Sequence, residues 1–136
     1  MEIIDYFKKN ENLKFRSAKH FYWDSSKEVI YYSKDMLKTL EGKMSLLHEI
    51  GHALLGHLDY KYDFELIKME ISAWDKSVTL AKLFNLQLDL RVIDENLKSY
   101  FKWLKKRQHC LICKENGMQL VNREYHCLNC SFSWQP

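Results

Sequence analysis

The stretch HEIGHALLGH, His48–His57, places three histidines and one glutamate in ten residues that are otherwise apolar or small. Its apolar residues predict a largely buried helix over about residues 44–55, with Gly56 as a natural stop. His48 and His52 are four residues apart, so their imidazoles project from the same face of this helix, one turn apart. Two imidazoles in this arrangement can share one Zn²⁺ ion, at about 2.0–2.1 Å from each nitrogen.

Glu49 adds a candidate catalytic group to the same helix. It lies about 100° round the helix axis from His48, so its carboxylate can reach the open side of a metal without ligating it. A carboxylate in this place can take a proton from water on the zinc, which is the chemistry of the HExxH metallopeptidases. HExxH also occurs by chance, and buried helices hold histidines for other reasons. A metal ion nevertheless supplies the partner that both buried histidines need.

The third ligand is expected from a second helix, predicted over about residues 63–85. Glu70 lies near the middle of this helix and beside its apolar stripe, and we favour it. Glu65 points about 140° away from Glu70, so only one of the two can face the metal. His57 is the other alternative, but metzincins place their third histidine six residues after the second, and here the interval is five. We expect His57 to cap the helix end or to support a ligand.

The four cysteines form two CxxC pairs separated by thirteen residues, at Cys110, Cys113, Cys127 and Cys130. Two such pairs joined by a short hairpin place four thiolates around one Zn²⁺ ion at about 2.3 Å. We therefore predict a structural zinc ribbon over residues 108–136, which folds only with its metal. A redox CxxC motif is the alternative, and two spaced pairs in so short a tail argue against it.

The rest of the chain predicts an α+β fold. The other expected elements are a short helix, the two strands of a β-hairpin and a last helix, at residues 2–9, 13–24, 28–33 and 91–106, with a break at Gly42. Five residues of the last helix are expected to face inward: Ile93, Leu97, Tyr100, Phe101 and Leu104. We predict a zincin-like minimal metallopeptidase domain in residues 1–107, with the N-terminal hairpin packed on three to four helices. The zinc ribbon, residues 108–136, is a small appendage.

HEIGHALLGH followed by a helix with Glu-x-x-Ala-Trp resembles the ImmA/IrrE-type zinc metallopeptidases of bacteria and their phages, over about residues 13–85. The resemblance implies a gluzincin-like site in which His48, His52 and Glu70 bind zinc. It implies that Glu49 is the base, and that the substrate is a protein, often a transcriptional repressor in phage or mobile-element control. The chain departs from the family around the second-helix glutamate, where EISAWDKSV replaces the frequent pattern E-A-x-x-F-A.

Partners other than a protein substrate are suggested by the segment KSYFKWLKKR, residues 98–107, which has five basic and no acidic side chains. Lysines suit the end of a solvated helix, because they complement its dipole. The same lysines can also contact phosphates, and Phe132 and Trp134 can stack on bases if they are exposed. Nucleic-acid binding through residues 98–136 is therefore an alternative, as is core packing of the two aromatic side chains.

The expected function is that of a zinc metalloendopeptidase with one catalytic and one structural zinc ion. The edge of the hairpin, including residues 20–23, can hold an extended peptide as an added strand. The SprT-type proteases, which act near DNA and also join a zincin to a zinc ribbon, are the runner-up, although no HG-x-x-W motif follows here. A non-catalytic binding module acting through the ribbon is a further alternative. With neither a long apolar run nor a signal-like N-terminus, we expect a soluble, cytoplasmic protein without a membrane partner.

Overall fold

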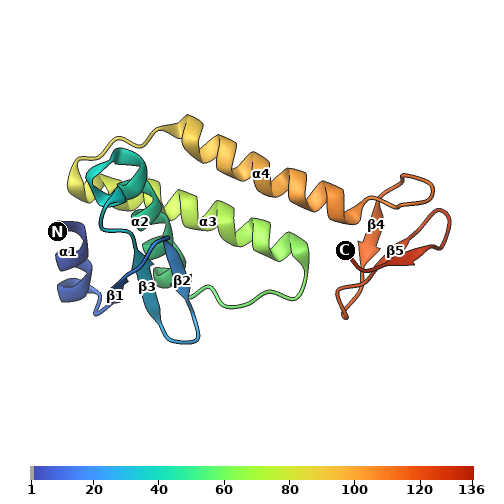
Figure 1. Ribbon diagram of the computed structural model, residues 1–136, viewed down its shortest axis with the longest axis horizontal. Coiled ribbons are helices and arrows are strands. Elements are labelled where there is room, and N and C mark those ends of the chain that lie inside the picture. Colours follow the sequence, from blue (N-terminus) through green and yellow to red (C-terminus); the bar gives the residue numbers. More distant parts are fainter. Residues whose placement is uncertain (1) are drawn as a thin grey trace.

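The computed structural model describes residues 2–136 and has a mixed α+β architecture (Figure 1). The helical elements are α1 (Glu2–Asn10), the 3₁₀ turn η1 (Met36–Lys38), α2 (Leu40–Leu54), α3 (Asp63–Ala81), the 3₁₀ turn η2 (Lys82–Phe84) and α4 (Leu90–Gln108). The strands are β1 (Lys14–Ser17), β2 (Tyr22–Asp24), β3 (Val29–Tyr32), β4 (Gly117–Gln119), β5 (Tyr125–Cys127) and β6 (Ser133–Trp134). The α+β class predicted from the sequence is confirmed by this content of helices and strands.

The N-terminal sheet has the strand order β1-β3-β2, so the outer edge of β2 is open. β2 and β3 form the predicted antiparallel hairpin, but β1 pairs with β3 in parallel. The prediction of one continuous strand over residues 13–24 was therefore wrong, because the chain leaves the sheet at residues 18–21 and returns on the other side of β3. Val29 and Ile30 of β3 are buried, and a buried strand needs hydrogen-bond partners on both edges. A simple hairpin would have left one edge of β3 unpaired.

Helix α2 begins earlier than predicted, at Leu40. Thr39 caps the helix, since its hydroxyl accepts a hydrogen bond from the N–H of Gly42 at 3.0 Å. The predicted break at Gly42 was wrong, because this residue lies in the first turn of α2. A Cβ atom there would overlap the carbonyl group of Met36, so the glycine allows η1 to pack against the start of the helix.

Helices α2 and α3 pack directly against each other at Gly51, in the middle of the HEIGH stretch. A Cβ atom on Gly51 would lie 2.7 Å from the carbonyl oxygen of Ala73, which is itself fully buried. Gly51 precedes His52 by one residue, and Ala73 follows Glu70 by three. The close approach of the two backbones therefore brings the histidine face of α2 to the glutamate face of α3.

Replacing Gly51 by alanine is expected to destabilise the fold by about 1–3 kcal/mol, because the added methyl group forces the two helices apart. The same change in an exposed helix would stabilise it by up to about 1 kcal/mol, through the higher helix propensity of alanine. Ser72→Ala, at an exposed position of α3, is the control and should change stability by less than about 0.5 kcal/mol. Thermal unfolding measures both, and a Gly51→Ala chain as stable as wild type would contradict the packing described.

Helix α4 packs against the rest of the fold along one face only. Val92, Ile93 and Leu97 pack partly buried against the core, and none of the residues of α4, all of which the structure describes, is fully buried. The prediction that Phe101 faces inward was wrong, because its side chain is 50% exposed. Phe101 follows Tyr100 by one position and so lies about 100° round the helix from it, outside the stripe. Among the described residues, no helix combines the length and the apolar character needed to cross a membrane.

The tail forms a second antiparallel sheet, in the order β4-β5-β6. Its own small core consists of buried side chains at Cys110, Tyr125, Cys127 and Trp134. Figure 1 shows the tail beyond the C-terminal end of α4, and Tyr125 reaches the first residue of α3, Asp63. The ribbon is thus docked at one end of the α3–α4 pair.

Candidate metal centres

The first candidate centre consists of two histidines of α2 and one glutamate of α3. His48 Nε2 and His52 Nε2 lie 3.1 Å apart. Glu70 Oε2 lies 2.9 Å from His48 Nε2, and Glu70 Oε1 lies 3.1 Å from His52 Nε2. Ligand atoms on a tetrahedral zinc ion with bonds of about 2.0–2.1 Å are about 3.3 Å apart, close to these separations. The three side chains are buried and their geometry is able to hold a metal ion.

The chemistry of these three groups also fits a cation. The Nε2 atoms of His48 and His52 lie 3.1 Å apart and both face the Glu70 carboxylate, so the three groups converge on one point. Burial raises the pKa of Glu70, but hydrogen bonds with the two histidines outweigh this and lower it to about 2. The carboxylate is therefore ionised, as a ligand must be. Two imidazole nitrogens and a carboxylate are a donor set that suits zinc and related first-row metals.

Packing around His48 fixes the direction of its ring. The ring stacks on the indole of Trp74, with centroids 4.2 Å apart and an angle of 27° between the planes. Trp74 follows Glu70 by four residues and so lies on the same face of α3. The helix that supplies the carboxylate therefore also holds the imidazole of His48 in place.

The two alternatives for the third ligand have other roles in the structure. Glu65 lies at the start of α3, where its carboxylate accepts a hydrogen bond from the N–H of Tyr62 at 3.1 Å and caps the helix. His57 Nδ1 lies 2.8 Å from His52 Nδ1. Burial and the neighbouring His52 lower the pKa of His57, which favours the neutral ring. When His52 binds a metal through Nε2, its Nδ1–H can donate to the Nδ1 atom of a neutral His57, which orients the His52 ring.

Glu49 lies beside this centre, in a cleft of about 890 Å³. The cleft is bounded by α2, α3, α4, the strand β2 and the loop of residues 55–62. Trp23 of β2 lines the cleft together with Glu49. Burial raises the pKa of Glu49, while the nearby His48 and His52 lower it. The structure thus brings together the predicted ligands, the predicted base and the edge strand in one cleft.

Tyr100 of α4 is a residue of this cleft to which the sequence assigned no chemical role. Its side chain lines the cleft together with Glu70 and Glu49. Burial, together with the charges of Glu70 and Glu49, raises the pKa of Tyr100 to about 12, so the side chain keeps its proton and acts as a donor. The sequence did indicate that Tyr100 faces inward, because Tyr100 follows Ile93 by seven residues and so continues the inward stripe of α4.

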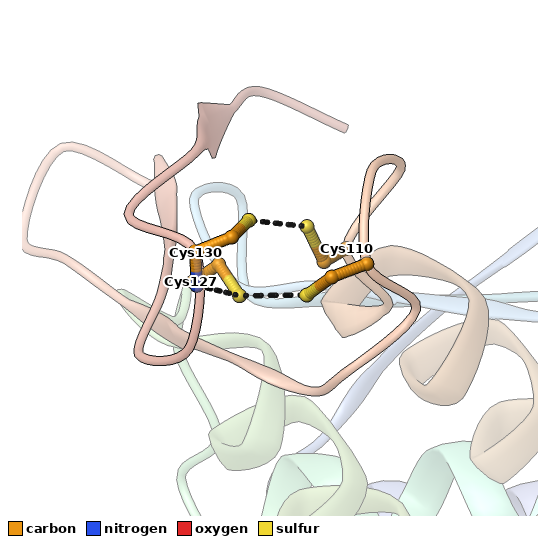
Figure 2. Close-up of side chains that lie close together, drawn as sticks. Cys110, Cys127 and Cys130 are labelled. Carbon is orange, nitrogen blue, oxygen red and sulfur yellow. Dashed lines mark hydrogen bonds between the residues drawn. The ribbon is translucent and has the colours of Figure 1, made fainter.

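The second candidate centre is formed by the four cysteines (Figure 2). The sulfur of Cys110 lies 3.6 Å from that of Cys130, and the sulfur of Cys113 lies 3.4 Å from that of Cys127. All four lie within 4.8 Å of one another. Sulfur ligands on a tetrahedral zinc ion with bonds of about 2.3 Å are about 3.8 Å apart. The cluster is therefore compact enough to hold one metal ion.

The protonation of the thiols supports the same interpretation. A hydrogen bond involving Asn129, together with other hydrogen bonds, lowers the pKa of Cys113 to about 6. A backbone hydrogen bond at Phe132 lowers the pKa of Cys130, but desolvation and the three neighbouring sulfurs outweigh it and raise the pKa to about 12. Four thiolates cannot all ionise at this distance without a cation between them, and a divalent metal supplies that charge.

Some of the residues considered for nucleic-acid binding make contacts within the protein instead. Trp134 is buried in the core of the ribbon, and its Nε1–H donates to the carbonyl of Arg107 at 2.8 Å. The guanidinium of Arg107 in turn pairs with Asp63 at 2.8 Å. Of the two aromatic side chains considered for base stacking, Phe132 keeps 37% exposure and Trp134 is packed inside.

Comparisons of the chain with protein-family models, with curated proteins and with solved structures found no match. The two centres are therefore assigned from the positions and chemistry of their own side chains, as groups able to hold metal ions.

Proposed function

We propose that this protein is a zinc-dependent metallopeptidase. The observation that carries the proposal is the convergence of His48, His52 and Glu70 beside Glu49, in a cleft bounded by an open strand edge. The resemblance of HEIGHALLGH and the following helix to ImmA/IrrE-type metallopeptidases supports the same activity. We propose the zincin-like arrangement for this domain on the same grounds, with zinc as the metal of both centres.

In this mechanism the three ligands hold the metal, and zinc, when bound, supplies Lewis acidity for the scissile carbonyl and for the attacking water. Glu49 accepts the proton of that water on its carboxylate and then passes it to the leaving amine. Tyr100 donates a hydrogen bond from its hydroxyl group to the carbonyl oxygen as negative charge develops there. His57 keeps His52 in the orientation and tautomer that binding requires.

The substrate in this proposal is a protein segment in extended conformation. The outer edge of β2 faces the cleft near Glu49, and an unpaired strand edge can accept a peptide as an additional strand. Aromatic side chains of Phe21, Trp23 and Tyr60 line the same cleft and offer contacts to the apolar side chains of that peptide. By its resemblance to the ImmA/IrrE-type enzymes, we propose a regulatory protein, such as a transcriptional repressor, as the substrate.

The proposal is tested by mapping new peptide N-termini in a bacterial cell lysate after incubation with the protein. Wild type and Glu49→Gln are compared, and N-termini that appear only with wild type support the proposal and identify the substrate. N-termini that appear equally with both chains, or with neither, contradict it. The second case favours the alternative of a non-catalytic binding module.

Replacing Tyr100 by phenylalanine is expected to lower kcat on the identified substrate by about 10²-fold, because one donor to the developing oxyanion is lost. Both zinc ions should be retained, since Tyr100 belongs to neither candidate metal group. Phe101→Leu, at the adjacent exposed position, is the control and should leave kcat unchanged. Steady-state kinetics and metal analysis decide, and an unchanged kcat in Tyr100→Phe would remove this tyrosine from the mechanism.

A further inference from the structure

The loop of residues 55–62 forms one wall of the cleft but has no regular secondary structure of its own. Leu58 is 69% exposed and the side chain of Asp59 is 88% exposed, so burial does little to order its middle. On the side of the sheet, the indole Nε1–H of Trp23 donates to the carbonyl of His57 at 2.9 Å. The exposed middle of the loop, between this contact and the start of α3, needs a second attachment if the wall is to keep its shape.

That attachment comes from the cysteine-bearing tail. Arg123, in the turn between β4 and β5, donates a hydrogen bond from its guanidinium to the carbonyl of Tyr60 at 2.5 Å. The guanidinium also lies over the Tyr60 ring, 5.0 Å from its centroid, and 3.8 Å from the carboxylate of Asp59. One side chain thus makes three different contacts with two neighbouring residues of the wall, both of which line the cleft.

The tail that presents Arg123 is anchored beside the loop. Asp63, the first residue of α3, is 1% exposed and accepts hydrogen bonds from Arg107 Nε at 2.8 Å and from the Tyr125 hydroxyl at 2.9 Å. Its own N–H donates to the side chain of Gln119 at 2.7 Å. Because Tyr125 and Gln119 belong to β5 and β4, the ribbon hairpin is fixed at the point where the loop enters α3. The position of Arg123 therefore depends on the fold of the hairpin.

The fold of the hairpin in turn depends on the cysteine cluster. Cys127 is the last residue of β5, and Cys113 lies shortly before β4. Small ribbons of this kind take their folding free energy from the metal that joins such cysteines. A chain that loses this metal would release the hairpin, and with it the side chain of Arg123.

We propose that the cysteine ribbon is a part of the cleft, in which Arg123 is a positioning residue that holds the 55–62 loop as a wall for the substrate. Metal binding at the four cysteines then controls the shape of a cleft formed by other residues. The effect on substrate rests on the proposed function, while the effect on the loop does not.

Hydrogen exchange of the full-length, zinc-loaded chain tests the proposal with Arg123→Gln. The amides of residues 55–62 should exchange about 5–30-fold faster than in wild type, while those of β4 and β5 should be unchanged. Both zinc ions should be retained. On the identified substrate, KM should rise by a similar factor with little change in kcat, because the wall binds and does not react. Arg16→Ala, at an exposed arginine of β1, is the matched control and should change none of these quantities.

Cys130→Ser provides the second arm, because Cys130 is the exposed member of the cluster. This variant should lose one zinc ion, keep the other, and show faster exchange both in the ribbon and in residues 55–62. Unchanged exchange of the loop in Arg123→Gln would overturn the proposal, as would a loop that stays protected when the ribbon of Cys130→Ser is released. Faster amide exchange of the loop in Arg123→Gln with an unchanged KM would overturn the role of Arg123 in substrate binding. A wild type without peptidase activity would contradict the proposed function, while the exchange data would still decide whether Arg123 holds the loop.

Discussion

Replacing Glu70 by alanine is expected to reduce the zinc content from two ions per chain to one. The carboxylate of Glu70 lies within 3.1 Å of both ligand nitrogens, and it is the one acidic group that joins the two histidines in the candidate centre. Loss of a partner outside the direct ligands typically costs about 10–100-fold in metal affinity, so loss of a direct ligand should cost more. Metal analysis of the dialysed protein measures the change, and the ribbon zinc provides an internal reference.

Glu65→Ala is the matched control for this experiment, because it removes a glutamate from the same helix. Glu65 caps α3 through the N–H of Tyr62, so its loss should cost about 0.5–2 kcal/mol of stability and no zinc. Two zinc ions in Glu70→Ala together with one in Glu65→Ala would reverse the assignment of the ligand. Two zinc ions in both variants would contradict a centre that depends on a carboxylate from α3.

Replacing Glu49 by glutamine is expected to lower kcat by about 10²–10⁴-fold, the range that general acid–base catalysis supplies. Glutamine has nearly the same shape but cannot accept the proton of the attacking water. Glu49 is not a member of the group that can hold the metal, so the zinc content should stay at two ions per chain. The measurement is the rate of cleavage of the identified substrate, made alongside metal analysis.

Glu41→Gln, on the exposed start of the same helix, controls for the loss of one negative charge. It should leave the rate unchanged. A Glu49→Gln chain that cleaves as fast as wild type would remove this carboxylate from the mechanism. If that chain also keeps every cellular effect of wild type, the binding-module alternative is favoured over an enzyme.

The shared direction of the two histidines in the first candidate centre could be predicted from the sequence, because it depends on helix periodicity. Two histidines four residues apart share a face in any α-helix, and the structure places His48 and His52 on α2 in that way. Glu70 was preferred to Glu65 because it lies nearer the middle of the second helix and near its apolar stripe. The structure brings Glu70 to the histidines because Gly51 and Ala73 let the two backbones approach.

The features that the sequence did not predict depend on contacts between distant parts of the chain. The parallel pairing of β1 with β3 has no local signature, because it follows from the burial of β3 within the sheet. The position of Tyr100 in the cleft with Glu70 requires the packing of α4 against α3. The bond from Arg123 to Tyr60 joins residues 63 positions apart and requires the docking of the ribbon. Periodicity describes one helix or strand at a time and carries no information about such packing.

Anomalous diffraction at the zinc absorption edge, from crystals of the zinc-loaded protein, shows whether His48, His52 and Glu70 bind zinc together. Two peaks per chain are expected. One should lie among the four cysteine sulfurs, and the other about 2.0–2.2 Å from His48 Nε2, His52 Nε2 and a carboxylate oxygen of Glu70. A peak at the cysteines alone, with the two imidazoles turned away from each other or from Glu70, would contradict it.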